Sequence, residues 1–323
     1  MSTMGTMRAI SQDAFGGPEA LKPVEKTRPS PLPTEVLVRV MAAGVNPVDI
    51  KTRSGDGMAA VLGDPPFTVG WDVSGIVEEV GFGVHTLQPG DEVYGMPWFP
   101  REAGAYAEYV TAPSRQFARK PQSLDHEHAA GVPLAALTAW QTVVDAAAVQ
   151  EGQRVLVHAA AGGVGHFAVQ LAKHLGAHVI GTARAPKHAW LRELGADKLI
   201  DYTWERFEDL VSEVDVVIDL IGEGADRTST RSLATLRENG LLVAVPSGVP
   251  GEVRSAARER GLRATGFLVE PDGHALARLA QLIDDGAIHV EVEDALPLEE
   301  AGEAHRRSET GRTRGKLVLR VAS

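Results

Sequence analysis

Short runs of β-branched residues, separated by Gly and Pro, fill the first third of the chain. The run at residues 36–40 follows three prolines, which keep the preceding segment extended. Similar runs predict strands at residues 73–80, 92–94 and 105–110. Strands joined by Gly and Pro turns, with few helical periods between them, indicate a small barrel-like β domain.

Near Leu124 the pattern changes to alternating strands and helices. The Ala-rich residues 128–148 favour helix, interrupted at Pro133, and residues 154–158 are typical of a strand. From Val164 to Gly176 the apolar positions recur at helical spacing. Further strands are predicted at residues 178–181, 198–200, 214–220 and 241–245, with helices at 185–194 and 229–237. This alternation predicts a doubly wound parallel sheet.

After Gly266 the pattern predicts one helix at residues 274–285 and a last strand at 316–321, which we expect to return to the first domain. The predicted fold class is therefore α/β. The predicted domains are a β-rich catalytic domain over residues 1–125, a dinucleotide-binding domain over 126–265, and a segment over 266–323 that rejoins the first domain.

Composition excludes several classes of protein. The chain has 32 Lys and Arg against 43 Asp and Glu, a formal charge of −11, which disfavours a nucleic-acid partner. The 323 residues include no Cys, so disulfides, Cys-ligated zinc, iron–sulfur clusters and thiolate nucleophiles are excluded. No apolar stretch approaches ~18 residues and the first residues do not resemble a signal peptide. We therefore expect a cytoplasmic protein with no membrane contact.

A glycine turn links the strand at 154–158 to the following helix. It contains Gly162, Gly163, Val164 and Gly165, although Ala160 stands where the usual G-x-G-x-x-G pattern begins. Small residues let the backbone approach a pyrophosphate, and the helix N-terminus offers N–H donors to it. The strand–turn–helix context therefore predicts a dinucleotide site.

The next strand distinguishes NADP from NAD. An NAD site needs an acidic residue ~20 positions after the turn, to bind the ribose 2′-hydroxyl. That position holds Thr182, and the cations Arg184 and Lys187 follow it. Cations suit a 2′-phosphate, so the sequence predicts NADPH as cofactor. The alternative is that both cations belong to a solvated helix start.

Other catalytic patterns are not found in the sequence. His126-Glu127-His128 places two His at i and i+2, which do not share a helix face, so a metal site is not expected there. No Tyr is followed by Lys four residues later, and no G-x-S-x-G turn offers a nucleophile.

Several motifs together resemble the zinc-independent quinone oxidoreductase branch of the medium-chain dehydrogenase/reductase superfamily, as in zeta-crystallin-like NADPH:quinone reductases. They are Phe15-Gly16-Gly17-Pro18, Gly44-Val45-Asn46-Pro47-Val48-Asp49 with Arg53, Gly70-Trp71-Asp72, Pro133–Trp140, the glycine turn and Gly315-Lys316-Leu317-Val318. The resemblance implies a GroES-like β-barrel catalytic domain, an inserted Rossmann domain and a homodimer. Zinc-using relatives have a Gly-His-Glu segment where this chain has Trp71-Asp72, so no metal is expected.

The resemblance also implies site residues. Asn46, Asp49 and Arg53 are the predicted catalytic residues. The predicted cofactor residues, beyond the glycine turn, are Pro47, Lys51, Thr138, Thr182, Arg184, Lys187, Tyr202, Leu220, Ile221, Val245, Ser247, Gly248, Phe267, Leu268, Val269 and Lys316. Each of four assignments has a purely structural alternative. Asn46 would only shape a turn, Asp49 and Arg53 would form a local ion pair, Tyr202 would be an aromatic side chain packed in the fold, and Ser247-Gly248 would be a plain turn.

The acceptor is predicted from what the sequence lacks. Without a metal or a proton donor of its own, the site suits a small-molecule quinone or an α,β-unsaturated carbonyl, whose product can take its proton from solvent. Met96, Trp98 and Phe99 form an apolar loop that we expect to line the acceptor pocket, unless they cap the β domain. The alternative functions are a 2-enoyl-thioester reductase and a non-catalytic NADPH-binding protein.

Overall fold

The computed structural model describes residues 5–245 and 248–322 and divides the chain into two compact units. The first unit comprises Met1–Leu137, Glu270–Gly286 and Val290–Ser323, and the second comprises Thr138–Val269 and Ala287–His289. The first compact unit therefore extends past residue 125, where the predicted catalytic domain ends. Residues 290–323 belong to the first unit, so the C-terminal segment packs with N-terminal strands.

The first unit is built on antiparallel strands. A two-stranded sheet joins β1 (Thr6–Ser11) to β2 (Lys22–Thr27). The larger sheet has the order β14-β15-β3-β4-β5-β7, with β6 also paired to β3. Its strands are β3 (Glu35–Val45), β4 (Asp72–Val80), β5 (Glu92–Gly95), β6 (Tyr109–Pro113), β7 (Phe117–Arg119), β14 (Val292–Pro297) and β15 (Lys316–Arg320). The helices are α1 (Pro47–Arg53), α2 (Ala59–Leu62), α3 (His126–Ala130), α10 (Gly273–Asp284) and α11 (Ala301–Glu309).

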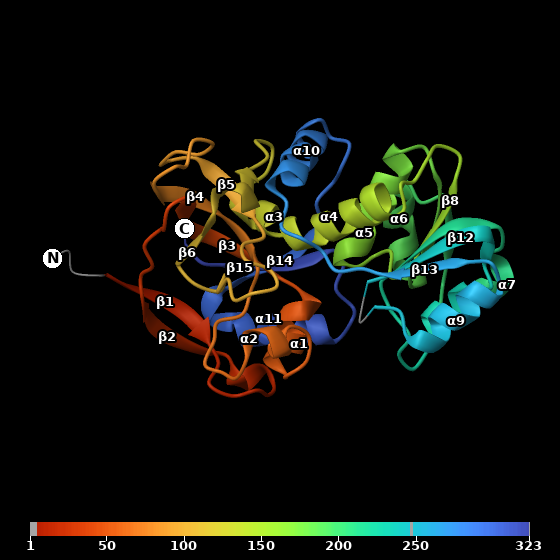
Figure 1. Ribbon diagram of the computed structural model, residues 1–323, viewed down its shortest axis with the longest axis horizontal. Coiled ribbons are helices and arrows are strands. Elements are labelled where there is room, and N and C mark those ends of the chain that lie inside the picture. The colour runs from red at the N-terminus through yellow and green to blue at the C-terminus, as the bar shows by residue number, and fades with distance from the viewer. Residues whose placement is uncertain (1–4, 246–247, 323) are drawn as a thin grey trace. The chain divides into compact units, whose positions relative to one another are not determined.

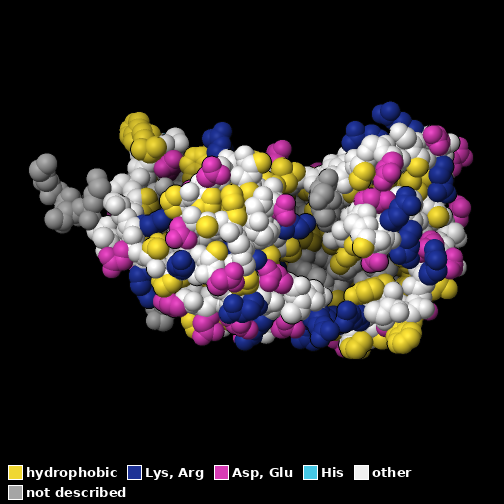
Figure 2. Space-filling view, turned by 90° about the horizontal axis from the view of Figure 1, so that it is seen from below, with side chains coloured by type: hydrophobic (Ala, Val, Ile, Leu, Met, Phe, Trp, Pro, Cys, Tyr) yellow, Lys and Arg dark blue, Asp and Glu magenta, His cyan; other side chains and the backbone are white. Residues whose placement is uncertain are grey.

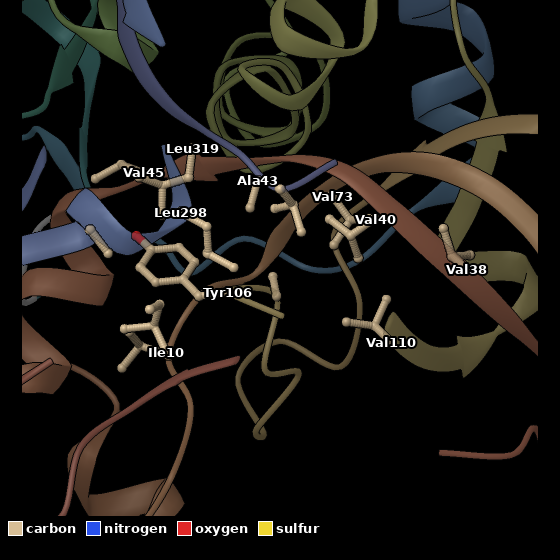
Figure 3. Close-up of a cluster of buried hydrophobic side chains, with 14 of the residues drawn as sticks. Ile10, Val38, Val40, Ala43, Val45, Val73, Tyr106, Val110, Leu298 and Leu319 are labelled. Atoms are coloured by element: carbon tan, nitrogen blue, oxygen red, sulfur yellow. The ribbon is translucent and has the colours of Figure 1, made fainter. Parts of the chain in front are cut away.

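Alternating apolar residues of β3 supply the centre of this unit's core. Val38, Val40 and Ala43 are completely buried, and they pack with residues from β4, the segment before β6, and β15 (Figure 3). Figure 3 also shows the ring of Tyr106 among these aliphatic side chains. Burial of such side chains is the main stabilising contribution to the unit.

One strand prediction in this unit is wrong in its bounds. The predicted strand at residues 105–110 is irregular until β6 begins at Tyr109. Ala107 forms only an isolated bridge to Ala9, and Tyr106 is buried with its hydroxyl bonded to polar side chains. The apolar pattern of this segment therefore reflects burial in the core and not ladder pairing.

The second unit is the doubly wound domain that the alternating pattern predicts. Its parallel sheet has the order β10-β9-β8-β11-β12-β13. The strands are β8 (Arg154–Val157), β9 (His178–Thr182), β10 (Lys198–Ile200), β11 (Val214–Asp219), β12 (Leu236–Ala244) and β13 (Arg263–Gly266). The helices are α5 (Gly163–His174), α6 (His188–Glu193), α7 (Phe207–Leu210), α8 (Thr228–Ser232) and α9 (Gly251–Glu259). Figure 1 shows α5 and α6 on one side of this sheet, with α7 and α9 on the other.

Two helix predictions need correction here. The predicted helix at 229–237 ends with α8 at Ser232, because Leu236 already begins β12 and pairs with Val214. The predicted helical stretch at 128–148 is divided into α3, α4 (Pro133–Trp140) and a π-helix at Gln141–Ala146. The sequence pattern does not predict α9 and β13, because α9 is rich in charged residues and β13 is largely exposed.

Charged side chains of both signs are interspersed on the face drawn in Figure 2. Within the described residues, the helices are all too short or too polar to cross a bilayer.

Candidate functional site

The turn between β8 and α5 has the geometry of a phosphate-binding turn. The Gly162 N–H donates to the Ala159 carbonyl at 2.9 Å, and Ala159 itself has a φ of 48°. A Cβ at Gly165 would lie 2.2 Å from the Ala159 oxygen, so this position requires glycine. Among the described residues no side chain caps α5 at Gly162, which leaves its N-terminal N–H groups for a ligand. Gly163 and Val164 are partly exposed beside it.

The buried side chain of His158 contacts the glycine turn through the hydroxyl of Thr182. The Ala159 N–H donates to the Thr182 hydroxyl at 3.3 Å, and that hydroxyl meets His158 Nδ1 at 3.2 Å. His158 Nε2 lies 2.9 Å from the hydroxyl of Ser232. Burial lowers the pKa of His158 to about 4, so the ring is neutral. The structure therefore places Thr182, a predicted cofactor residue, where it holds the turn.

Two predicted 2′-phosphate residues lie together at the end of neighbouring strands. Arg184 follows β9, Tyr202 follows β10, and Arg184 Nε donates to the Tyr202 hydroxyl at 3.1 Å. Both side chains are exposed. Lys187 ends the 3-10 helix Ala185–Lys187 and is partly buried. The Arg184–Tyr202 pair thus presents a guanidinium and a phenol at the edge of the sheet where parallel α/β domains bind ligands.

The other predicted cofactor residues of this unit follow the remaining strands at the same edge. After β11, Asp219 Oδ1 accepts hydrogen bonds from the Ile221 and Gly222 N–H groups, both at 2.9 Å. Ile221 and Leu268 are exposed and Val269 is buried. Leu220, Val245, Gly248 and Phe267 are partly buried, and Ser247 lies outside the described residues. Thr138 is buried in α4.

A cluster of three buried polar side chains lies in the first unit. Asn46 Nδ2 donates to Asp72 Oδ2 at 2.8 Å, and Lys316 Nζ donates to Asn46 Oδ1. Lys316 Nζ also lies 3.4 Å from Asp72 Oδ2, and the Leu134 N–H donates to Asp72 Oδ1 at 2.7 Å. Burial raises the pKa of Asp72, whereas Lys316 and the Asn46 amide favour its ionised form. The cluster therefore links Lys316 of β15 to Asp72 of β4 through Asn46, which precedes α1.

The structure gives Asp49 and Arg53 partners other than each other. Asp49 Oδ2 accepts from the Asn46 N–H at 2.7 Å and so stabilises the start of α1. Arg53 Nη2 pairs with Glu309 Oε1 at 2.5 Å, and Arg53 Nε donates to the Gly16 carbonyl at 3.0 Å. The local i, i+4 ion pair that their spacing allows is therefore not formed. Pro47 and Lys51 are exposed on α1.

The apolar loop residues lie in or against the core of the first unit. Met96 and Phe99 are buried, and Phe99 packs edge-on against Trp71 with ring centroids 5.4 Å apart. Trp98 is partly exposed, and its indole donates to the Thr111 carbonyl at 2.7 Å. These contacts match the alternative in which the loop caps the β domain, and a role in an acceptor pocket stays a prediction.

Two family comparisons match separate parts of the chain. Residues 32–122 match the family described as Alcohol dehydrogenase GroES-like domain. Residues 194–319 match the family described as Zinc-binding dehydrogenase.

Similar whole proteins are known from sequence and from structure. The quinone oxidoreductase of Coxiella burnetii is 40% identical, with a TM-score of 0.93 over 98% of this chain and 100% of that chain. The Escherichia coli quinone oxidoreductase, solved with NADPH, is 31% identical, with a TM-score of 0.87 over the same shares. An Arabidopsis thaliana protein named NADPH-dependent alkenal/one oxidoreductase, chloroplastic, is 34% identical over 97% of this chain and 79% of its own length.

The chain belongs to the medium-chain dehydrogenase/reductase superfamily. Its relatives in that superfamily are quinone and enone oxidoreductases, so the predicted family and fold class are confirmed.

The donor set of this superfamily member does not suit a catalytic zinc ion. Catalytic zinc takes Cys, His or carboxylate ligands and keeps one open position. The chain has no Cys, and Asp72 is already bonded to Asn46, Lys316 and Leu134. The Trp71 indole donates to the Arg101 carbonyl at 2.6 Å. Over residues 5–245 and 248–322, no three His, Asp or Glu side chains gather as a metal-binding set.

Three buried polar residues near the predicted catalytic ones are not predicted as site residues from the sequence. The sequence indicates Asp72 only as a departure from the zinc pattern, and it does not single out Tyr106 or His305. His305 bonds to Tyr106 and Arg53, residues 199 and 252 positions away in the sequence. The available signal was their residue type: a His and a Tyr at otherwise apolar positions need partners when buried.

Proposed function

We propose that this chain catalyses zinc-independent hydride transfer from NADPH to a quinone or an α,β-unsaturated carbonyl. The predictions of an oxidoreductase, of NADPH and of a quinone or enone acceptor agree with the named relatives and their NADPH-bound structures. The observation that supports a zinc-independent mechanism is the Lys316 ammonium beside Asn46 and Asp72, because a fixed positive charge next to this carboxylate disfavours the binding of a metal cation there.

The second unit supports cofactor binding through two features. The uncapped start of α5 offers N–H donors to a diphosphate, and Gly165 lets the backbone pass close to it. Arg184 beside Tyr202 suits a 2′-phosphate, because a guanidinium binds phosphate oxygens in a bidentate manner. When bound, NADPH supplies the hydride.

The first unit supplies the charge that a reduced acceptor needs. Hydride addition to an enone or quinone places negative charge on an oxygen. The Lys316 ammonium is a buried cation with three donors, two of which meet Asn46 and Asp72. We propose that the third N–H and the Asn46 side chain orient the acceptor or the nicotinamide end of the cofactor, and that the product takes its proton from solvent.

The first experiment follows the loss of NADPH absorbance with an ortho-quinone and with an enone, in chelator-treated buffer, with NADH as the control. Rapid oxidation of NADPH with undiminished rate after chelation supports the proposal. A rate that disappears on chelation and returns with zinc contradicts the zinc-independent mechanism. Tight NADPH binding without reduction of either acceptor favours a 2-enoyl-thioester reductase, or a non-catalytic NADPH-binding protein if enoyl thioesters also fail.

A homodimer and a cytoplasmic location are further proposals. Strand β13 lies at one end of the six-stranded sheet, and its residues are largely exposed, which supports pairing with a second copy at this edge. Light scattering of the purified protein gives the mass directly, and cell fractionation gives the compartment.

A further inference from the structure

A continuous chain of four buried polar side chains runs through the first unit. Arg53 Nη1 lies 3.2 Å from His305 Nδ1, His305 Nε2 lies 3.0 Å from the Tyr106 hydroxyl, and that hydroxyl lies 3.1 Å from Asp49 Oδ2. All four residues are 3% exposed or less. Glu309 pairs with Arg53 at the outer end and is itself exposed.

The chemistry of arginine fixes the direction of every hydrogen bond in this chain. A guanidinium can only donate, so His305 Nδ1 must accept and therefore carries no proton. The neutral ring then has its proton on Nε2, which donates to the Tyr106 oxygen. The Tyr106 proton is left to donate to Asp49. All three bonds thus point from Arg53 toward the Asp49 carboxylate.

Burial makes that carboxylate difficult to keep ionised. Burial raises the pKa of Asp49 to about 7. Among the described residues, its Oδ1 has no hydrogen-bond partner. Asp72 also raises the pKa of Asp49, while the Asn46 N–H, Lys316 and the Tyr106 hydroxyl lower it. Burial, with Arg53 nearby, lowers the pKa of His305 to about 3, so the ring stays neutral.

We propose that His305 and Tyr106 are positioning residues for hydride transfer: they deliver one directed hydrogen bond that keeps Asp49 ionised, and the ionised Asp49 holds Asn46 against Lys316. This inference rests on the proposed function, which assigns Asn46 and Lys316 to the cofactor and acceptor. Asp49 acts here through the Asn46 N–H that it accepts at 2.7 Å. When Asp49 is protonated, its acceptor strength falls and the start of α1 loosens, which displaces Asn46.

The decisive variant is Tyr106→Phe, which removes the hydroxyl and keeps the ring within the core shown in Figure 3. Because Tyr106 favours the ionised carboxylate, we expect the acidic limb of the kcat–pH profile to move up by about one pH unit. The value of kcat falls near pH 7 and recovers at higher pH, and the Kd for NADPH stays within about twofold of the original. Tyr94→Phe is the matched control, because Tyr94 is equally buried and its hydroxyl donates to the Leu276 carbonyl at 2.6 Å.

His305 allows a rescue experiment. His305→Gln keeps a carbonyl oxygen to accept from Arg53 and an amide N–H to donate to Tyr106, so the profile should remain close to that of the unmodified protein. His305→Leu removes both bonds and should shift the acidic limb as Tyr106→Phe does. Equal profiles for Tyr106→Phe and Tyr94→Phe, or no advantage of Gln over Leu, would overturn the proposal.

A measurement on the unmodified protein covers the case in which these variants do not fold. The ¹⁵N chemical shifts of His305 should report a protonated Nε2 and an unprotonated Nδ1 between pH 5 and pH 8. The opposite tautomer, or a charged ring in this range, contradicts the directed chain. If the unmodified protein reduces neither a quinone nor an enone, the proposed function fails, whereas the tautomer measurement can still succeed or fail independently.

Discussion

Arg184 Nε donates a hydrogen bond to the Tyr202 hydroxyl at 3.1 Å, and each residue lies two positions beyond the end of its strand. β9 and β10 are adjacent and parallel, with Ile180 opposite Lys198. Residues at equal distances past paired strands therefore meet at one edge of the sheet. A sequence separation of 18 residues becomes a direct contact, and this contact is where we expect cofactor discrimination.

Arg184→Ala should weaken NADPH binding much more than NADH binding. A charge-assisted hydrogen bond contributes ~1.5–3 kcal/mol, so the Kd for NADPH should rise by about tenfold or more. The binding of NADH, which has no 2′-phosphate, should change little. Fluorescence titration with both cofactors measures the ratio.

Arg258→Ala is the control for that experiment, because Arg258 is an exposed cation of the last turn of α9. It should leave the NADPH to NADH ratio unchanged. Equal losses of both cofactors in Arg184→Ala would mean that Arg184 does not contact the 2′-phosphate.

Gly165→Ala should destabilise the second unit. Its Cβ would lie 2.2 Å from the Ala159 carbonyl oxygen, so the turn or α5 must move. Such overpacking costs ~1–3 kcal/mol, which lowers the midpoint of thermal unfolding by several degrees. Gly224→Ala is the matched control, since a Cβ there meets nothing within 4 Å. A Gly165→Ala variant as stable as Gly224→Ala would contradict the close packing of this turn.

Lys316→Met should make stability depend strongly on pH. It leaves the Asp72 carboxylate buried without its cation, and breaking a buried pair costs ~3–5 kcal/mol. Burial already raises the pKa of Asp72, and losing Lys316 raises it further. An Asp whose pKa is raised by folding binds its proton more tightly in the folded chain than in the unfolded chain, where the pKa is ~3.9. It therefore stabilises the folded chain below pH ~3.9, and this stabilisation is lost as pH rises through the pKa of the folded state. Urea unfolding should therefore show a smaller defect at acidic pH than at neutral pH.

The double variant Lys316→Met with Asp72→Asn tests that explanation. With the charge removed, most of the neutral-pH defect should disappear, although the reductase activity should not return. If both variants are equally unstable at neutral pH, the loss comes from packing and not from the uncompensated carboxylate.

His158→Gln should remove part of the acid sensitivity of the second unit. The pKa of His158 is lowered to about 4 in the folded chain, so the unfolded chain binds the proton more readily. Stability therefore falls by roughly 1.4 kcal/mol per pH unit as pH drops from about 6.5 toward 4. Because Gln does not titrate, the urea unfolding midpoint of the His158→Gln variant should decline less than that of the unmodified protein between about pH 6.5 and about pH 4. A parallel decline in both proteins would assign the acid sensitivity to other groups.

Much of the architecture could be predicted because it is encoded locally. The strand at residues 36–40 and the helix after the glycine turn follow from the spacing of apolar residues, and both are present as β3 and α5. Arg184 and Tyr202 could be named because each follows a recognisable strand. Their roles toward the cofactor, like those of the other predicted site residues, stay predictions.

The buried polar network could not be predicted because its contacts join distant parts of the chain. Nothing near Tyr106 in the sequence indicates His305, and the i, i+4 spacing of Asp49 and Arg53 indicates a pair that tertiary partners replace. Met96 and Phe99 illustrate another limit: apolar loop residues have the same pattern whether they face a ligand or the core.

The pairing of β15 with β3 has a consequence for synthesis on the ribosome. Leu317 of β15 lies opposite Val45 of β3, so β3 cannot form this pairing until about 270 more residues have been synthesised. Domains fold as units during translation. The second unit, which comes almost entirely from Thr138–Val269, can therefore fold while the β-rich unit still has an open edge. Because β15 also brings Lys316, the second unit can be complete before the cation reaches Asn46. If the proposed function is correct, the chain therefore becomes competent for catalysis last.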